Sequence, residues 1–110
     1  MTVERRERIR ALNDQLRRDN SGGRILITDG VTALGEVILK ALLIAVQRFE
    51  KFDEDNDPYG EHDFGAVTIA RHRFFWKIDY YDPSMTSGAV DPADAVGTVR
   101  VLTLMLAEEY

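Results

Sequence analysis

The stretch Ala66–Asp82, "AVTIARHRFFWKIDYYD", decides the fold, because apolar and polar residues alternate along it. Alternation with a period of two predicts a pair of antiparallel strands with one buried face. A turn centred on Arg71–His72 pairs Val67 with Trp76 and gathers an apolar row of Val67, Ile69, Phe74, Trp76, Ile78 and Tyr80. The opposite face then carries Thr68, Phe75, Lys77, Asp79 and Tyr81. We therefore expect a β-hairpin that packs one face against helices.

Two helices and a strand are expected on the N-terminal side of this hairpin. Apolar residues recur at helical spacing between Val3 and Arg18, which predicts an amphipathic helix. The consecutive apolar residues Ile25–Ile27 lie between turn signals and predict a short strand. A second helix is expected from Asp29 or Thr32, either of which can act as its N-cap, to about Phe52.

The C-terminal segment from about Thr98 to Glu109 is also predicted to be a helix, and Asp91 followed by Pro92 offers an alternative, earlier start. Its apolar residues recur at helical spacing, at Val99, Leu102, Met105 and Leu106. The element order is then α-β-α-β-β-α. This order predicts an α+β fold in one small domain over residues 1–110, with the antiparallel hairpin packed on helices.

Charge is unevenly distributed along the chain, whose net charge is −5. Residues 1–20 hold six arginines and four acidic residues, so a positive N-terminal segment precedes a strongly acidic remainder. The negatively charged remainder repels phosphate backbones, so we do not expect nucleic acid as a partner outside the first helix. Cysteine is absent, which excludes disulfides and thiolate metal sites. Without a secretory signal or a membrane-length apolar run, we expect a cytoplasmic location and no membrane partner.

Negative charge is concentrated in Asp53–Gly65, "DEDNDPYGEHDFG", which we call the acidic segment. A patch of this kind attracts basic surfaces and accelerates association. We therefore expect a non-enzymatic interaction protein whose protein partner presents a basic surface, with no cofactor. The acidic segment and the open face of the hairpin supply the predicted partner-binding residues Asp53, Asp55, Asp57, Tyr59, Glu61, Asp63, Asp79 and Tyr81.

A second interpretation is a small metal-assisted hydrolase or metal-binding protein that uses His62, Asp63 and Asp79. A strand that starts near His62 would place this residue opposite Tyr81 and diagonal to Asp79. Imidazole, carboxylate and phenol groups in that arrangement can bind a metal or transfer protons. The acidic segment lacks the spacing of an EF-hand calcium loop, so the hypothesis rests on these three candidate catalytic residues.

A third interpretation is a DNA-associated regulator that contacts phosphates through the arginine-rich first helix. Its arginines are Arg5, Arg6, Arg8, Arg10, Arg17 and Arg18. Interleaved acidic residues favour pairing within the helix instead. The thin apolar stripe of this helix and the apolar C-terminal segment can serve either the core of a monomer or the interface of a homodimer.

Several stretches resemble a family of short proteobacterial proteins that carry a domain of unknown function. The resemblance rests on "RIRALNDQLRR", "GGRILITDGVTALG", "FDEDNDPYGEHDFG", "FFWKIDYYD" and "DPADAVGTVRVLTLMLAEEY", with GEHDFG at Gly60–Gly65 and KIDYYD at Lys77–Asp82. Members look like accessory proteins of plasmids and mobile elements. The resemblance implies a protein that binds host or competitor machinery, such as an anti-restriction or anti-CRISPR inhibitor of a nucleic-acid-handling complex.

Overall fold

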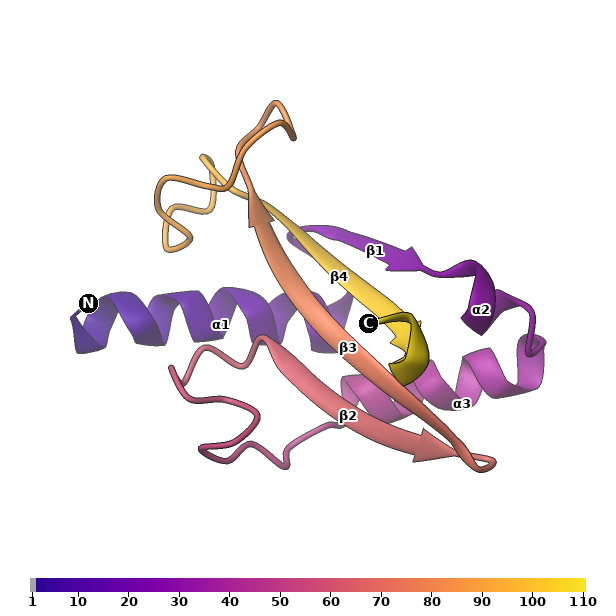
Figure 1. Cartoon of the computed structure of the whole chain (residues 1–110). Coiled ribbons are helices and arrows are strands. Elements are labelled where there is room, and N and C mark those ends of the chain that lie inside the picture. Colours follow the sequence, from indigo (N-terminus) through magenta and orange to yellow (C-terminus); the bar gives the residue numbers. More distant parts are fainter. Residues whose placement is uncertain (1) are drawn as a thin grey trace.

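The computed structural model describes residues 2–110, which form one four-stranded sheet and a layer of helices (Figure 1). The strands are β1 (Arg24–Ile27), β2 (Phe64–Ile69), β3 (His72–Tyr81) and β4 (Val99–Leu106). The helices are α1 (Val3–Asp19), α2 (Asp29–Thr32), α3 (Glu36–Gln47) and the 3-10 turn η1 (Ala107–Glu109). The strand order is β1-β4-β3-β2, with β1 parallel to β4 and the other neighbours antiparallel. The predicted α+β class is confirmed.

Strands β2 and β3 form the predicted hairpin, but its turn lies one residue earlier than expected. The turn residues are Ala70 and Arg71, whose φ angles of 50° and 72° give the backbone twist of a two-residue hairpin turn. Val67 therefore pairs with Phe74 and not with Trp76. Because the register shifts by an even number of residues, the predicted apolar row is kept and faces the core.

The predicted C-terminal helix is wrong, because Val99–Leu106 is the strand β4 between β1 and β3. All residues from Arg100 to Met105 are buried, so both faces of this strand are covered. A strand buried on both faces loses the alternation of a half-exposed strand. A short apolar run of this kind cannot be told from a buried helix by its periodicity.

The predicted second helix is interrupted and ends earlier than expected. Gly35 has a φ of 96°, a conformation that favours glycine, and it separates the short α2 from α3. Helix α3 ends at Gln47, so the following chain to Phe52 is not helical. This early end lets Phe49 pack edge-on against Trp76, with ring centroids 5.4 Å apart.

The hydrophobic core lies between the sheet and helices α1 and α3, which cover the same face (Figure 1). Its fully buried residues include Leu16, Val31, Leu42, Phe74, Trp76 and Leu104. Helix α1 begins at the N-cap Thr2 and ends at Asn20, whose φ of 55° is left-handed. Within residues 2–110, no helix has both the length and the apolar content of a membrane span.

Gly65 allows β2 to approach Trp76 closely. A Cβ atom built on Gly65 would lie 2.8 Å from Cζ of Phe49 and closer still to the indole nitrogen of Trp76. Both neighbours belong to the core. A side chain at position 65 would therefore push apart the contact between β2 and the centre of the sheet.

We expect Gly65→Ala to lower the free energy of unfolding by about 1–3 kcal/mol, because overpacking forces the two aromatic rings to move. Urea denaturation followed by Trp76 fluorescence measures this change. Gly88→Ala is the matched control, since its Cβ would meet no atom nearer than 3.9 Å. An unchanged stability of Gly65→Ala would contradict the close packing described for β2.

Candidate interaction surface around the acidic segment

The first part of the acidic segment is a turn that its own side chains hold in place. The Asp53 carboxylate accepts hydrogen bonds from the backbone N–H groups of Asp55 and Asn56, at 2.9 and 3.0 Å. The Asn56 side chain accepts a bond from the Asp53 N–H and donates one to the Lys51 carbonyl. Asp53, Glu54 and Asp55 are all exposed. This turn therefore presents three adjacent carboxylates to solvent in a defined conformation.

The second part of the acidic segment is folded into the protein, which corrects the prediction of one continuous exposed surface. The Asp57 side chain is 6% exposed and accepts a hydrogen bond from the His62 backbone N–H at 3.0 Å. Glu61 is 9% exposed, and its carboxylate accepts a hydrogen bond from the Tyr80 hydroxyl at 2.8 Å. A buried carboxylate needs such donors because burial removes its hydration. The Asp57 and Glu61 side chains therefore have hydrogen-bond donors within the fold and expose little surface.

A buried polar network connects Glu61 to helix α1 and to the sheet. The Asn13 side-chain amide donates to the Glu61 carbonyl at 3.0 Å and to the Tyr80 hydroxyl oxygen at 2.8 Å. Its oxygen accepts from Nε of Arg100 at 2.9 Å. Arg100 also donates to the Pro92 carbonyl, and its guanidinium lies over the Tyr80 ring. Asn13 thus joins α1, the acidic segment and both central strands.

Burial shifts the pKa values of two members of this network, Tyr80 and Arg100. It raises the pKa of Tyr80 far above its ordinary value, so the phenol keeps the proton that it donates to Glu61. Burial also lowers the pKa of Arg100 from its ordinary value. The nearby Tyr80 and Glu61 act in the opposite direction on this guanidinium. The network is therefore maintained by matched donors and acceptors inside the protein.

His62 lies outside the strand, which corrects the expected position opposite Tyr81. Its φ of 56° turns the chain before β2 begins, and its ring stacks on Phe52 with centroids 3.8 Å apart. Nδ1 of His62 is 2.9 Å from the Asp14 carboxylate. His62 therefore attaches the acidic segment to α1.

Asp63 and Asp79 do not combine with His62 into a metal site. The Asp79 carboxylate forms an ion pair with Lys77 at 2.8 Å, on the open face of the sheet. Burial, and next the charge of Glu61, raise the pKa of Asp63 to about 6. Within residues 2–110, no group of three histidine or acidic side chains is close enough to hold a metal ion. His62 does not join the two carboxylates because it turns toward α1 instead of continuing the strand.

Four of the six arginines of α1 bind loops of the same chain. Arg5 pairs with Asp91 at 2.8 Å, while Arg8 and Arg10 donate to the carbonyls of Ala93 and Gly60. Arg17 is fully buried and donates to the carbonyls of Val46 and Gln47 at the end of α3 and of Phe49 just after it. These contacts occupy guanidinium groups that the DNA-binding hypothesis needs on the surface.

Sequence reasoning missed Asn13 and Arg100, the two residues at the centre of the polar network. Asn13 lies on the buried face of α1 beside Ile9 and Leu16, all three fully buried. A polar residue within an apolar stripe is a usable signal, because a buried amide requires partners. Arg100 offered a similar signal as a charged residue in an apolar run, although the run was interpreted as a helix.

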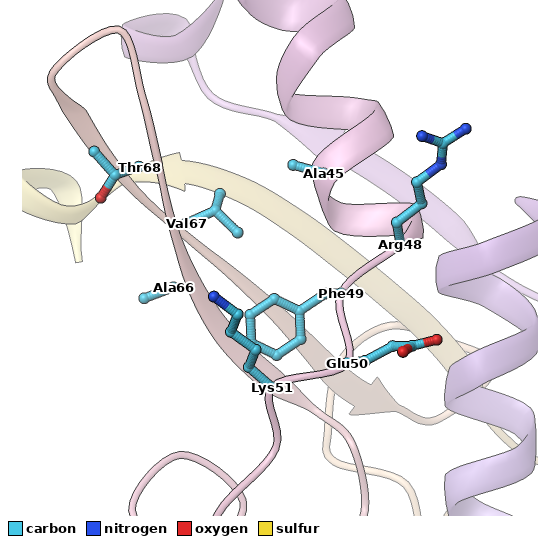
Figure 2. A pocket seen from close by; sticks show the side chains of 8 residues that line it. All are labelled: Ala45, Arg48, Phe49, Glu50, Lys51, Ala66, Val67 and Thr68. Carbon is cyan, nitrogen blue, oxygen red and sulfur yellow. The ribbon is translucent and has the colours of Figure 1, made fainter.

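A groove runs beside β2, next to the exposed part of the acidic segment. Its larger hollow, of about 750 Å³, lies between the end of α3 and β2 (Figure 2). Its lining residues are Ala45, Arg48, Phe49, Glu50, Lys51, Ala66, Val67 and Thr68. A second hollow of about 370 Å³ shares Phe49, Lys51 and Ala66 with the first and extends to Asp53, Asp55, Asn56, Phe64, Arg73 and Phe75. The groove thus connects an apolar floor to the carboxylates of the exposed turn.

We expect Asn13→Ala to lower the free energy of unfolding by about 2–4 kcal/mol, because it removes the hydrogen-bond partner of the buried Arg100 Nε and of the Glu61 carbonyl. Chemical denaturation monitored by circular dichroism provides the measurement. Gln15→Ala on the exposed side of α1 is the control, with an expected change of at most about 0.5 kcal/mol. Equal effects of the two substitutions would show that the network contributes little.

We expect Asp63→Asn to stabilise the protein by about 1–3 kcal/mol at pH 7.5. The folded pKa of about 6 exceeds the ordinary value of 3.8, so the ionised Asp63 carboxylate destabilises the folded state above pH 6. The difference from the wild type should shrink as the pH falls through 6 and vanish near 3.8. Denaturation curves between pH 7.5 and 4 test this sign, and a destabilised variant at pH 7.5 would refute it.

Comparison with known proteins gives a family and no activity. No curated protein and no solved structure matches the chain. The family described as a protein of unknown function, DUF3768, matches residues 27–109. This match includes the acidic segment and strands β2, β3 and β4, but not α1. Since it covers more than half of the chain, the protein belongs to the DUF3768 family.

Proposed function

We propose that this protein is a small acidic interaction module that binds a protein partner with a basic surface. The residues proposed to contact the partner are Asp53, Glu54, Asp55 and Tyr59. Asp63, Asp79 and Tyr81 are proposed to lie at the edge of this contact surface. The binding mode is electrostatic docking followed by packing of an aromatic side chain.

The observation that carries this proposal is the different use of the carboxylates within the acidic segment. Asp57 and Glu61 are largely buried and have donors from other parts of the fold, whereas Asp53, Glu54 and Asp55 are exposed. Asp53 accepts hydrogen bonds from backbone N–H groups of its own turn. In the described part of the chain, none of these three forms an ion pair with a basic side chain. Adjacent like charges repel one another, so a cationic partner would relieve an unfavourable interaction that the free protein maintains.

Tyr59 supports the proposal as a candidate aromatic anchor. Its side chain is 72% exposed, although it lies between the buried Asp57 and Glu61. Arg10 binds the carbonyl of the next residue, Gly60, at 2.7 Å, which limits the movement of the chain at this point. An exposed tyrosine on a fixed backbone binds at a low cost in conformational entropy.

The class of partner that fits this chemistry best handles nucleic acid. Proteins of that class present lysine and arginine clusters to phosphates, and an acidic protein surface can compete for these clusters. We therefore propose inhibition of a nucleic-acid-handling complex, in the manner of anti-restriction or anti-CRISPR proteins. Direct DNA binding by α1 is less favoured, because its arginines bind the loops described above.

The test is affinity capture of a partner from the native host, followed by binding measurements with a neutralised variant. We expect the triple substitution Asp53→Asn, Glu54→Gln and Asp55→Asn to slow association by at least about tenfold at low salt. Asparagine at position 53 keeps the side-chain oxygen that accepts the turn hydrogen bonds. Stopped-flow or surface plasmon resonance gives the association rate.

The matched control removes three exposed carboxylates elsewhere, through Glu7→Gln, Glu36→Gln and Glu108→Gln. It changes the net charge by the same amount, so only a local effect of the acidic segment separates the two variants. Binding that is equally fast in both variants and insensitive to salt would overturn the proposed function.

A further inference from the structure

Strand β2 leaves one edge of the sheet without a neighbouring strand. It is the last strand in the order β1-β4-β3-β2 and pairs only with β3. A free edge presents backbone N–H and C=O groups that can pair with another extended chain. The hydrogen-bond pattern of the hairpin shows which residues of β2 offer these groups.

The outward groups belong to Phe64, Ala66 and Thr68. The N–H of Ile78 donates to the carbonyl of Asp63 at 2.9 Å, which fixes the alternation of hydrogen-bonded pairs in this antiparallel ladder. Gly65, the next hydrogen-bonded position, faces Trp76 across the ladder. The residues between these positions direct their backbone groups away from β3. Three regularly spaced donor and acceptor sites are therefore free along the edge.

The groove described above lies along the same edge. Ala66, Val67 and Thr68 form one side of the larger hollow, and the chain at Phe49–Lys51 forms the other (Figure 2). Phe49 supplies an aromatic floor, and the Lys51 side chain extends toward β2. At the Phe64 end, the smaller hollow is bordered by Asp53 and Asp55, and it is also lined by Lys51 and Arg73. The edge therefore combines backbone pairing sites, an apolar floor and two carboxylates at one end.

We infer that an extended segment of a partner protein adds to β2 as a fifth strand, with a lysine or arginine side chain placed beside Asp53 and Asp55. This inference rests on the proposed function and specifies how the partner is held. Backbone pairing gives affinity, while the charge at one end of the groove fixes the direction and register of the segment. Small or apolar side chains of the segment contact Phe49 and Ala66.

A single extended segment fits this edge better than a second folded copy of the chain. The residues from Phe49 to Asn56 run beside the groove and border it on the side away from β2. A single extended chain needs only the width of one strand beside β2, whereas a second sheet would bring its neighbouring strands against this wall.

The test uses a phage-displayed library of random linear peptides, selected against the full chain. A selected peptide is then titrated into isotope-labelled protein and followed by NMR. We expect selected sequences to alternate apolar and polar residues and to carry lysine or arginine near one end. We expect the largest amide shifts at Phe64, Ala66 and Thr68. Failure to select a peptide, or shifts confined to another surface, would overturn the inference.

Thr68→Pro tests the backbone contact directly, because proline removes an outward N–H without removing a bond to β3. We expect it to weaken peptide binding at least about tenfold, while Thr68→Val keeps the N–H and binds like the wild type. Wild-type affinity in Thr68→Pro would contradict strand addition. The NMR shifts of the wild type decide the matter independently if this variant does not fold.

The charge-neutralised triple variant separates this inference from the proposed function. Weaker binding in the triple variant with full binding in Thr68→Pro keeps the acidic docking surface and rejects strand addition. Full binding in the triple variant with weaker binding in Thr68→Pro supports strand addition and shows that the carboxylates do not select the partner. Self-association in sedimentation experiments that Thr68→Pro abolishes would identify a second copy as the occupant and overturn the inference.

Discussion

The hydrogen bonds of Asn13 connect parts of the chain that are far apart in the sequence. This one amide, on the buried face of α1, contacts Glu61, Tyr80 and Arg100. A buried guanidinium and a buried carboxylate would each be costly alone, so the amide and the phenol between them make their burial tolerable. The position of the acidic segment against α1 depends on this network and on the neighbouring contacts of Arg10 and His62.

These contacts give a structural role to motifs that could be taken for an active site. In Gly60–Gly65, the glutamate accepts from Tyr80, the histidine contacts Asp14, and the last glycine lies under Trp76. In Lys77–Asp82, Tyr80 joins the buried network, and Asp82 accepts hydrogen bonds from Thr86 and Ser84 in the next turn. The raised pKa of Asp63 is the exception, because it marks a carboxyl group that the fold holds at an electrostatic cost.

The acidic segment therefore has two parts with different uses. Its second half is anchored by the helix and the sheet, while its first half is a turn that closes on itself through Asp53 and Asn56. Anchoring one half limits the positions available to the other, so Asp53 and Asp55 stay next to the free edge of β2. A surface that is held in place before binding loses less conformational entropy when a partner arrives.

The sequence alone determined the first helix, the hairpin with its apolar face, and the concentration of negative charge before β2. These features depend on local periodicity and composition, which act within a few neighbouring residues. It did not determine β4, because a strand covered on both faces has the same apolar run as a buried helix, and its neighbours decide between them. The sequence also did not determine which carboxylates are buried and which are exposed. Glu61 is buried because α1 and Tyr80 lie beside it, whereas Asp55 has no such neighbours and is exposed. Only the tertiary structure places those donors.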